Sequence, residues 1–140
     1  MAAKYGSQSI VASVDLAKIN HKYQVKINNG SVLINSDAKL FIENIVNEQI
    51  VGEIYLTSME RDGTAQGYDL ESLSLLPKNN TIPVILSGGV GNAQHFLDGI
   101  SDERVSAIST AHLFNFVGDG LKKARHFLIQ RGISLANWGD

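Results

Sequence analysis

Two polar segments that follow strand-like runs could bind an anion. Ser87-Gly88-Gly89-Val90-Gly91 comes after the apolar run PVIL and leads into a helix-like segment, and Thr110-Ala111-His112 follows another such run. Glycines here let the backbone approach an anion, and the free N–H groups of a helix start can bind it. Alternatively the glycines only form tight turns, because the loop is neither a Walker loop nor a good dinucleotide fingerprint. Two such loops after adjacent strands favour phosphate binding.

Three acidic residues lie near the beginning or end of strand-like runs. Asp15 follows an apolar run and could transfer a proton at the rim of a sheet, although a carboxylate that caps the next loop is about as common. Asp62, in Glu60-Arg61-Asp62-Gly63, either forms an ordinary Asp-Gly turn or belongs to a site. Glu53 begins an otherwise apolar run, so we expect it at the opposite, amino-terminal mouth of the sheet.

The histidines and the possible nucleophiles give few further predictions about a site. The four histidines have no metal-ligand spacing among themselves or with acidic residues, so the sequence implies no metal site and no cofactor. Only His112, beside a candidate phosphate loop, has a plausible functional place. No Ser/His/Asp arrangement and no nucleophile elbow is present.

The elements that must position these residues alternate along the chain. Apolar, β-branched runs predict strands, and apolar residues at helical spacing predict helices. Strands are expected over residues 9–14, 23–27, 32–34, 52–57, 83–86 and 105–109, with a tight turn at Asn28-Asn29-Gly30. Helices are expected after an N-cap at Ser36 through residue 49, after an N-cap at Asp69 through residue 76, and over residues 93–100 and 120–131.

This order predicts an α/β fold with a parallel sheet and crossover helices. A closed eight-stranded barrel usually needs about 250 residues. Four strand–helix units in 140 residues therefore fit a (βα)4 half of a TIM-type (βα)8 barrel, with a β-hairpin inserted after the first strand. We expect one domain over residues 1–140, with its polar loops at the carboxyl ends of the strands, where such barrels carry their active sites.

Composition excludes several classes of function. With 12 Lys and Arg against 14 Asp and Glu, the chain has no basic surface for nucleic acid or an acidic membrane. The absence of cysteine excludes disulfides and thiolate zinc sites. No apolar run approaches the roughly 18 residues of a membrane span, and the start MAAKYGSQ lacks the apolar core of a secretory signal, so we expect a cytoplasmic protein.

The motifs as a set resemble a known family. GSQSIVASVD, GEIYLTSMERDGTAQGYDLE, IPVILSGGVGNAQHF and TAHLFNF are similar to the carboxyl-terminal half of the cyclase subunits of imidazole glycerol phosphate synthase. The resemblance implies a phosphate-binding (βα)8 barrel of histidine biosynthesis. Such a barrel receives ammonia from a glutaminase partner. With it the enzyme cleaves and cyclises a phosphoribulosyl aminoimidazole-carboxamide nucleotide to imidazole glycerol phosphate and a purine precursor.

The resemblance also implies roles for individual residues. Asp15 would be the general acid, and Glu53 the acidic member of a charged ammonia gate at the barrel floor. Thr57 and Ser87 would line the substrate pocket. The phosphate would be bound by Asp62, Gly63, Gly88, Gly89, Ala111 and His112. His112 stands where the family usually has a serine, and Glu60 replaces the aspartate usual before the Arg-Asp-Gly motif.

The family's first half-barrel, with its general base and second phosphate site, has no counterpart in this sequence. Because a half-barrel exposes strand edges and an apolar face, we expect a complementary N-terminal half-barrel or a homo-oligomer as partner, besides the glutaminase and a phosphorylated substrate. Two alternatives stay open. One is a cyclase-like paralogue that acts with a glutamine amidotransferase on a surface-polysaccharide sugar. The other is a non-catalytic, phosphate-binding half-barrel.

Overall fold

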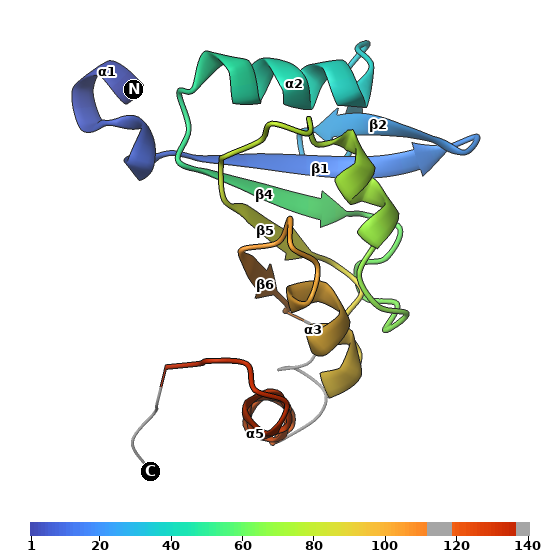
Figure 1. Cartoon of the computed structure of the whole chain (residues 1–140). Helices are drawn as coiled ribbons and strands as arrows, with labels where there is room; N and C mark the ends of the chain where they lie inside the picture. Colours follow the sequence, from blue (N-terminus) through green and yellow to red (C-terminus); the bar gives the residue numbers. More distant parts are fainter. Residues whose placement is uncertain (112–118, 137–140) are drawn as a thin grey trace.

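The computed structural model describes residues 1–111 and 119–136. Within them, a single six-stranded sheet has the order β3-β2-β1-β4-β5-β6 (Figure 1). Its parallel strands are β1 (Val11–Ile19), β4 (Glu53–Ser58), β5 (Val84–Ser87) and β6 (Ala107–Ser109), and its antiparallel strands are β2 (Lys22–Ile27) and β3 (Val32–Leu33). This parallel-dominated α/β sheet is consistent with part of a TIM-type barrel.

Helices connect the parallel strands, as the alternation of patterns predicts. The connecting helices are α2 (Ala38–Glu48), η2 (Leu70–Leu75) and α3 (Ala93–Ile100), whereas α1 (Ala2–Tyr5) and η1 (Ser7–Ser9) precede β1 and α5 (Gly120–Gln130) follows β6. Figure 1 shows η2 in front of the sheet, α2 along the side where β2 lies, and α5 beyond α3. Among the described residues, no helix has the length and apolar character needed to cross a membrane.

The hydrophobic core lies on one face of the sheet. Along the central strands every second side chain is almost fully buried, and these side chains join helix residues such as Ile42 and Leu73 in one cluster. The strand residues of this set are Val14, Leu16, Ile54, Leu56, Val84 and Leu86. The residues between them face the other side, where Val11 is 50% exposed. We call this side the open face.

Among the boundaries that differ from the sequence-based expectation, two affect how the site is positioned. β1 continues to Ile19 instead of ending at residue 14, because β2 pairs with it from Asp15 onward after a turn in which Asn20 and His21 have positive φ. At α2 the N-cap is Asp37 and not Ser36. The Asp37 carboxylate accepts the backbone N–H groups of Lys39 at 2.9 Å and Leu40 at 3.1 Å.

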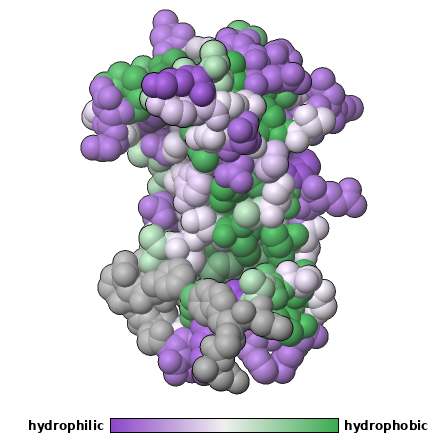
Figure 2. Space-filling model, turned by 90° about the vertical axis from the view of Figure 1, so that its left-hand side faces the viewer, coloured by the Kyte–Doolittle hydropathy of each residue, from purple (hydrophilic) through white to green (hydrophobic). Residues whose placement is uncertain are grey.

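Figure 2 views the molecule from the side on which the parallel strands begin. Hydrophobic residues gather in the middle of this side, below a hydrophilic upper part. Exposed apolar side chains lie in the segments that lead into the strands, such as Tyr5 and Ile50, and at the first residue of β1, Val11. This end of the sheet is therefore more apolar than an ordinary solvated loop surface.

Candidate functional site

A row of polar side chains crosses four parallel strands near their carboxyl ends. The register pairs Asp15 with Thr57, Thr57 with Ser87, and Ser87 with Ser109. Registered residues of neighbouring strands point to the same face, so all four side chains lie on the open face. Ser87 is 9% exposed, and the other three are partly exposed. We call this set the polar row.

Asp15 does not end its strand, as the sequence suggested. It is the fifth of nine residues in β1, because the hairpin with β2 prolongs the strand. It is still close to the end of the parallel pairing with β4, whose last pair is Leu16 with Ser58. Across the antiparallel pair it is opposite Lys26, whose side chain therefore points to the same face. The carboxylate thus shares the open face with one cationic neighbour.

The loops after β4 and β5 lie against each other beside this row. The Gly67 N–H donates to the Gly89 carbonyl at 2.7 Å. Gly88 has φ 92° and Gly89 φ 101°, and a Cβ added at Gly89 would lie 2.2 Å from the Gly67 carbonyl oxygen. Both conformation and space therefore require glycine at residue 89. Tight packing between the loops explains part of the glycine pattern that also predicted an anion site.

Several backbone N–H groups of these loops have no hydrogen-bond acceptor among the described residues. Within the described residues, the N–H groups of Gly63, Gly88 and Gly89 donate no hydrogen bond, whereas that of Asp62 donates to the Ser58 carbonyl at 3.0 Å. Asp62 and Gly63 are exposed, whereas Gly88 and Gly89 are buried. Unpaired backbone N–H groups bind phosphate without a cationic side chain where they converge on it.

Two members of this site, Tyr55 and Ser109, are not among the residues predicted from the sequence. The Tyr55 hydroxyl lies 2.9 Å from Ser87 Oγ and 2.8 Å from Ser109 Oγ. The Tyr68 hydroxyl donates to the Ser109 carbonyl at 3.0 Å, and burial, followed by the proximity of Tyr55, raises the pKa of Tyr68. Strand alternation was a usable signal, since Tyr55 stands two residues before Thr57 and must share its face.

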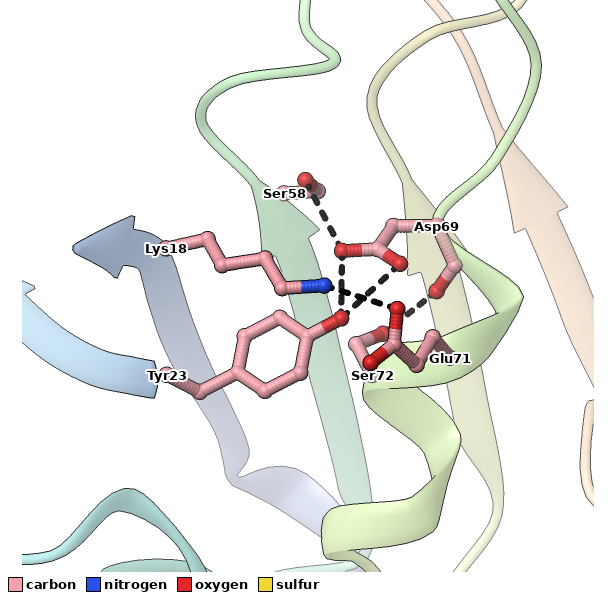
Figure 3. Close-up of polar contacts among 6 residues, drawn as sticks. All are labelled: Lys18, Tyr23, Ser58, Asp69, Glu71 and Ser72. Atoms are coloured by element: carbon pink, nitrogen blue, oxygen red, sulfur yellow. Dashed lines mark hydrogen bonds and ion pairs between the residues drawn. The ribbon is translucent and has the colours of Figure 1, made fainter. Parts of the chain in front are cut away.

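A second polar cluster lies near the same end of the sheet (Figure 3). Asp69, 8% exposed, accepts the Tyr23 hydroxyl at 2.9 and 3.0 Å and lies 3.4 Å from Ser58 Oγ. Lys18 Nζ forms an ion pair with Glu71 at 2.7 Å. Burial, and then the hydrogen bond to Asp69, raises the pKa of Tyr23. We call this group the Asp69 cluster.

The Asp69 cluster corrects one prediction. The Asp69 side chain does not cap the following helix, which is the 3-10 helix η2. Instead the carboxylate receives Tyr23 from β2, and its backbone carbonyl accepts Ser72 Oγ at 2.6 Å. Since the Lys18 N–H also donates to Glu60 Oε1 at 2.8 Å, the β1–β2 hairpin is tied both to η2 and to the loop after β4.

The other predicted residues are placed as follows. Glu53 is the first residue of β4, opposite Val11, so it lies at the amino-terminal end of the sheet as expected. Ala111 is exposed and follows β6 by two residues. His112 lies outside the described residues. Within residues 1–111 and 119–136, no group of three or more His, Asp and Glu side chains could hold a metal ion.

The family model and the similar proteins found by comparison agree with one another. The model of the histidine biosynthesis protein family matches residues 1–118. Imidazole glycerol phosphate synthase subunit HisF of Chlorobium phaeovibrioides is 42% identical over 135 residues, which cover 96% of this chain and 53% of that protein. The subunits of the same name from Chlorobium phaeobacteroides and Chlorobaculum tepidum are 40% and 38% identical, with the same coverage. The chain spans about half the length of the curated relatives it matches.

Proposed function

The chain belongs to the histidine biosynthesis protein family, and from this premise we propose that it is the carboxyl-terminal half of an imidazole glycerol phosphate synthase cyclase barrel. The resemblance drawn from the sequence motifs is confirmed at the level of the family. In this proposal β1, β4, β5 and β6 are the strands of the (βα)4 half, and β2 and β3 are a hairpin added to the first strand. The whole enzyme would catalyse the ammonia-dependent cleavage and cyclisation of a phosphoribulosyl aminoimidazole-carboxamide nucleotide.

The observation that carries this proposal is the alignment of the polar row with the glycine loops. Ser87, the third member of the row, is followed directly by Gly88 and Gly89, whose N–H groups donate no hydrogen bond within the described residues, and Asp15 is the first member, two strands away. A phosphate anchored at the loops would place the rest of an elongated substrate along the row toward Asp15. There the carboxyl group would act as the general acid, with Thr57 and Ser87 as polar contacts in between.

Free strand edges support a complementary half-barrel as partner. β2 pairs with β1 only from Asp15 to Ile19, so within the described residues the outer edge of residues 11–14 has no partner. β6 is the opposite edge of the sheet. An N-terminal half that paired with both edges would cover the open face and close a barrel, which removes the edges altogether.

The proposed glutaminase partner would dock at the other end. Glu53, which would be the acidic member of the ammonia gate, is the first residue of β4 and is registered with Val11, an exposed apolar residue at the start of β1. Ammonia released there would pass along the open face, inside the closed barrel, to the polar row. A cytoplasmic location remains a prediction from the composition.

Reconstitution tests this proposal. The N-terminal half of the Chlorobium phaeovibrioides relative is mixed with this chain, the cyclase substrate and an ammonium salt, and product formation is followed. We expect turnover in the mixture. Asp15→Asn should lower it by about 100-fold or more, the share that general acid catalysis typically provides, while inorganic phosphate binding changes less than about twofold. Asp98→Asn, an exposed carboxylate on α3, is the charge-matched control and should retain turnover.

Equal loss of turnover and phosphate binding in Asp15→Asn would show that Asp15 is structural. If the mixture binds phosphate but forms no product, the cyclase assignment is wrong. The polysaccharide paralogue or the non-catalytic half-barrel would then take its place.

A further inference from the structure

We infer that Tyr55, Ser87 and Ser109 form a subsite for a hydroxyl group of the ligand, next to the phosphate loops. The inference rests on the proposed function, because that function places a phosphate at those loops. It adds the side chains that recognise a hydroxyl of the phosphorylated-sugar substrate, two of which, Tyr55 and Ser109, have no role in the proposed function. We call these three side chains the hydroxyl trio.

The three side chains of the trio come from three neighbouring strands and from two register positions along them. Ser87 and Ser109 are registered neighbours in the polar row. Tyr55 stands two residues earlier along the strands, where it is registered with Ile85. To reach Ser109 Oγ at 2.8 Å, the phenol must extend across β5, about 5 Å of sheet per strand. Its ring therefore lies along the open face, and its hydroxyl is fixed between the two serines.

Counting hydrogens shows what the trio can offer. Each hydroxyl has one hydrogen and two acceptor sites. A phenol can donate to only one of the two serines, so the other serine donates to the phenol oxygen, or both serines donate to it. In every arrangement the two internal hydrogen bonds use two hydrogens, and one remains. That O–H and the unused lone pairs match a ligand hydroxyl, which both donates and accepts.

The position of the trio sets the kind of ligand. Tyr55 and Ser109 are partly exposed, and all three side chains lie on the open face, so a ligand can reach them. Gly88 follows Ser87 immediately, and its N–H group donates no hydrogen bond to the described residues. A phosphate ester with a hydroxyl on a neighbouring carbon would contact both the glycine loop and the trio.

The test compares two phosphate esters of equal length by chemical-shift titration of the ¹⁵N-labelled chain. They are glycerol 3-phosphate, which carries two hydroxyls, and n-propyl phosphate, which carries none. We expect the chain to bind glycerol 3-phosphate about fivefold tighter, the ratio that one added hydrogen bond typically gives. Tyr55→Phe should reduce this ratio to about one without changing the affinity for n-propyl phosphate or inorganic phosphate. Tyr5→Phe, an exposed tyrosine of α1, should retain the ratio.

The other outcomes are equally decisive. A ratio near one in the unsubstituted chain, or a ratio that Tyr55→Phe leaves unchanged, would overturn the hydroxyl subsite and leave the phosphate site standing. If neither ester nor inorganic phosphate shifts the Gly88 and Gly89 amides, the proposed phosphate site itself fails. Equal weakening of both esters in Tyr55→Phe would show a structural role for the phenol, and the unfolding midpoint of that variant would measure it.

Discussion

The two faces of the sheet are built from the same strands and serve different purposes. On the helix-covered face, Leu56 of β4 and Leu86 of β5 are at most 1% exposed and pack in the hydrophobic core. One residue further along the same strands, Thr57 and Ser87 lie on the open face and carry hydroxyls. Because side chains alternate along a strand, two consecutive residues lie on opposite faces, one in the core and the other on the face of the candidate site. Core packing and the proposed ligand recognition are thus assigned to alternate residues of each strand.

The polar groups of the two faces are also satisfied in different ways. On the helix-covered side, the Asp69 carboxylate is buried and takes its hydrogen bonds from Tyr23 and Ser58. On the open face, the serine hydroxyls bond to Tyr55 and keep capacity for a further partner. A closed set of hydrogen bonds stabilises a fold, whereas an incomplete one at an accessible place can bind a ligand.

The largest expected effect tests the difference between the faces directly. Leu86→Ala should lower the free energy of unfolding by about 3 kcal/mol, because it leaves a cavity in the core. Ile85→Ala, the adjacent residue on the open face, should cost about 1 kcal/mol, since its side chain is only partly buried. Urea denaturation of both variants, followed by circular dichroism, provides the measurement.

An equal cost of the two substitutions would mean that the open face is covered in solution, for instance by a second copy of the chain. Sedimentation equilibrium of the unsubstituted chain then distinguishes the cases. A stable monomer with equal costs would contradict the division into two faces.

A smaller effect is expected where the two loops meet. Gly89→Ala must hold an alanine at φ 101° and place its Cβ 2.2 Å from the Gly67 carbonyl oxygen. We expect a loss of about 2 kcal/mol in stability from the strained backbone and the displaced loop. Inorganic phosphate should bind about tenfold more weakly, since about 1.4 kcal/mol of lost N–H alignment corresponds to that factor.

Gly132 provides the matched control. It also has a positive φ, 84°, but a Cβ there would meet nothing within 4 Å, and it follows α5, away from the loops. Gly132→Ala should therefore lower stability by about 1 kcal/mol and leave phosphate binding unchanged. If both variants bind phosphate equally well, the loop contact is not needed for the site.

The alternation of strands and helices could be predicted because short patterns of neighbouring residues indicate it. Short β-branched runs predicted each of the parallel strands, and helical spacing predicted the helices between them. Asn28-Asn29-Gly30 indicated the turn between β2 and β3. The glycine loops were found because only glycine tolerates their backbone. These signals depend on a few neighbouring residues, so one sequence contains them.

What escaped prediction depends on partners distant in the chain. β1 reaches Ile19 only because β2 returns beside it, and Asp69 receives a tyrosine 46 residues earlier instead of capping its helix. Tyr55 looked like an ordinary strand residue, although alternation placed it on the face of Thr57. Its contact with Ser109 crosses β5, which no local pattern encodes.

The smallest effect concerns the Asp69 cluster and separates the closed network from the open one. Tyr23→Phe removes the hydrogen bonds to the buried carboxylate and keeps the ring, so we expect a loss of about 1.5 kcal/mol near neutral pH. The raised pKa of Tyr23 means that the folded chain holds this proton more tightly than the unfolded chain. Its contribution is therefore complete below about pH 10 and declines above it, as the phenol ionises in the unfolded chain.

Urea denaturation at pH 7.5 and 10.5 measures this dependence. The stability difference between the unsubstituted chain and Tyr23→Phe should be smaller at the higher pH, whereas Tyr5→Phe, at an exposed tyrosine, should match the unsubstituted chain at both. A difference that does not change with pH would show that packing, and not the hydrogen bond to Asp69, accounts for the stabilisation. Phosphate binding should be unchanged by Tyr23→Phe, because the hydroxyl trio and the glycine loops do not include this residue. Weaker phosphate binding would instead mean that the hairpin sets the position of the loop after β4, so that the closed network acts on the site through Lys18 and Glu60.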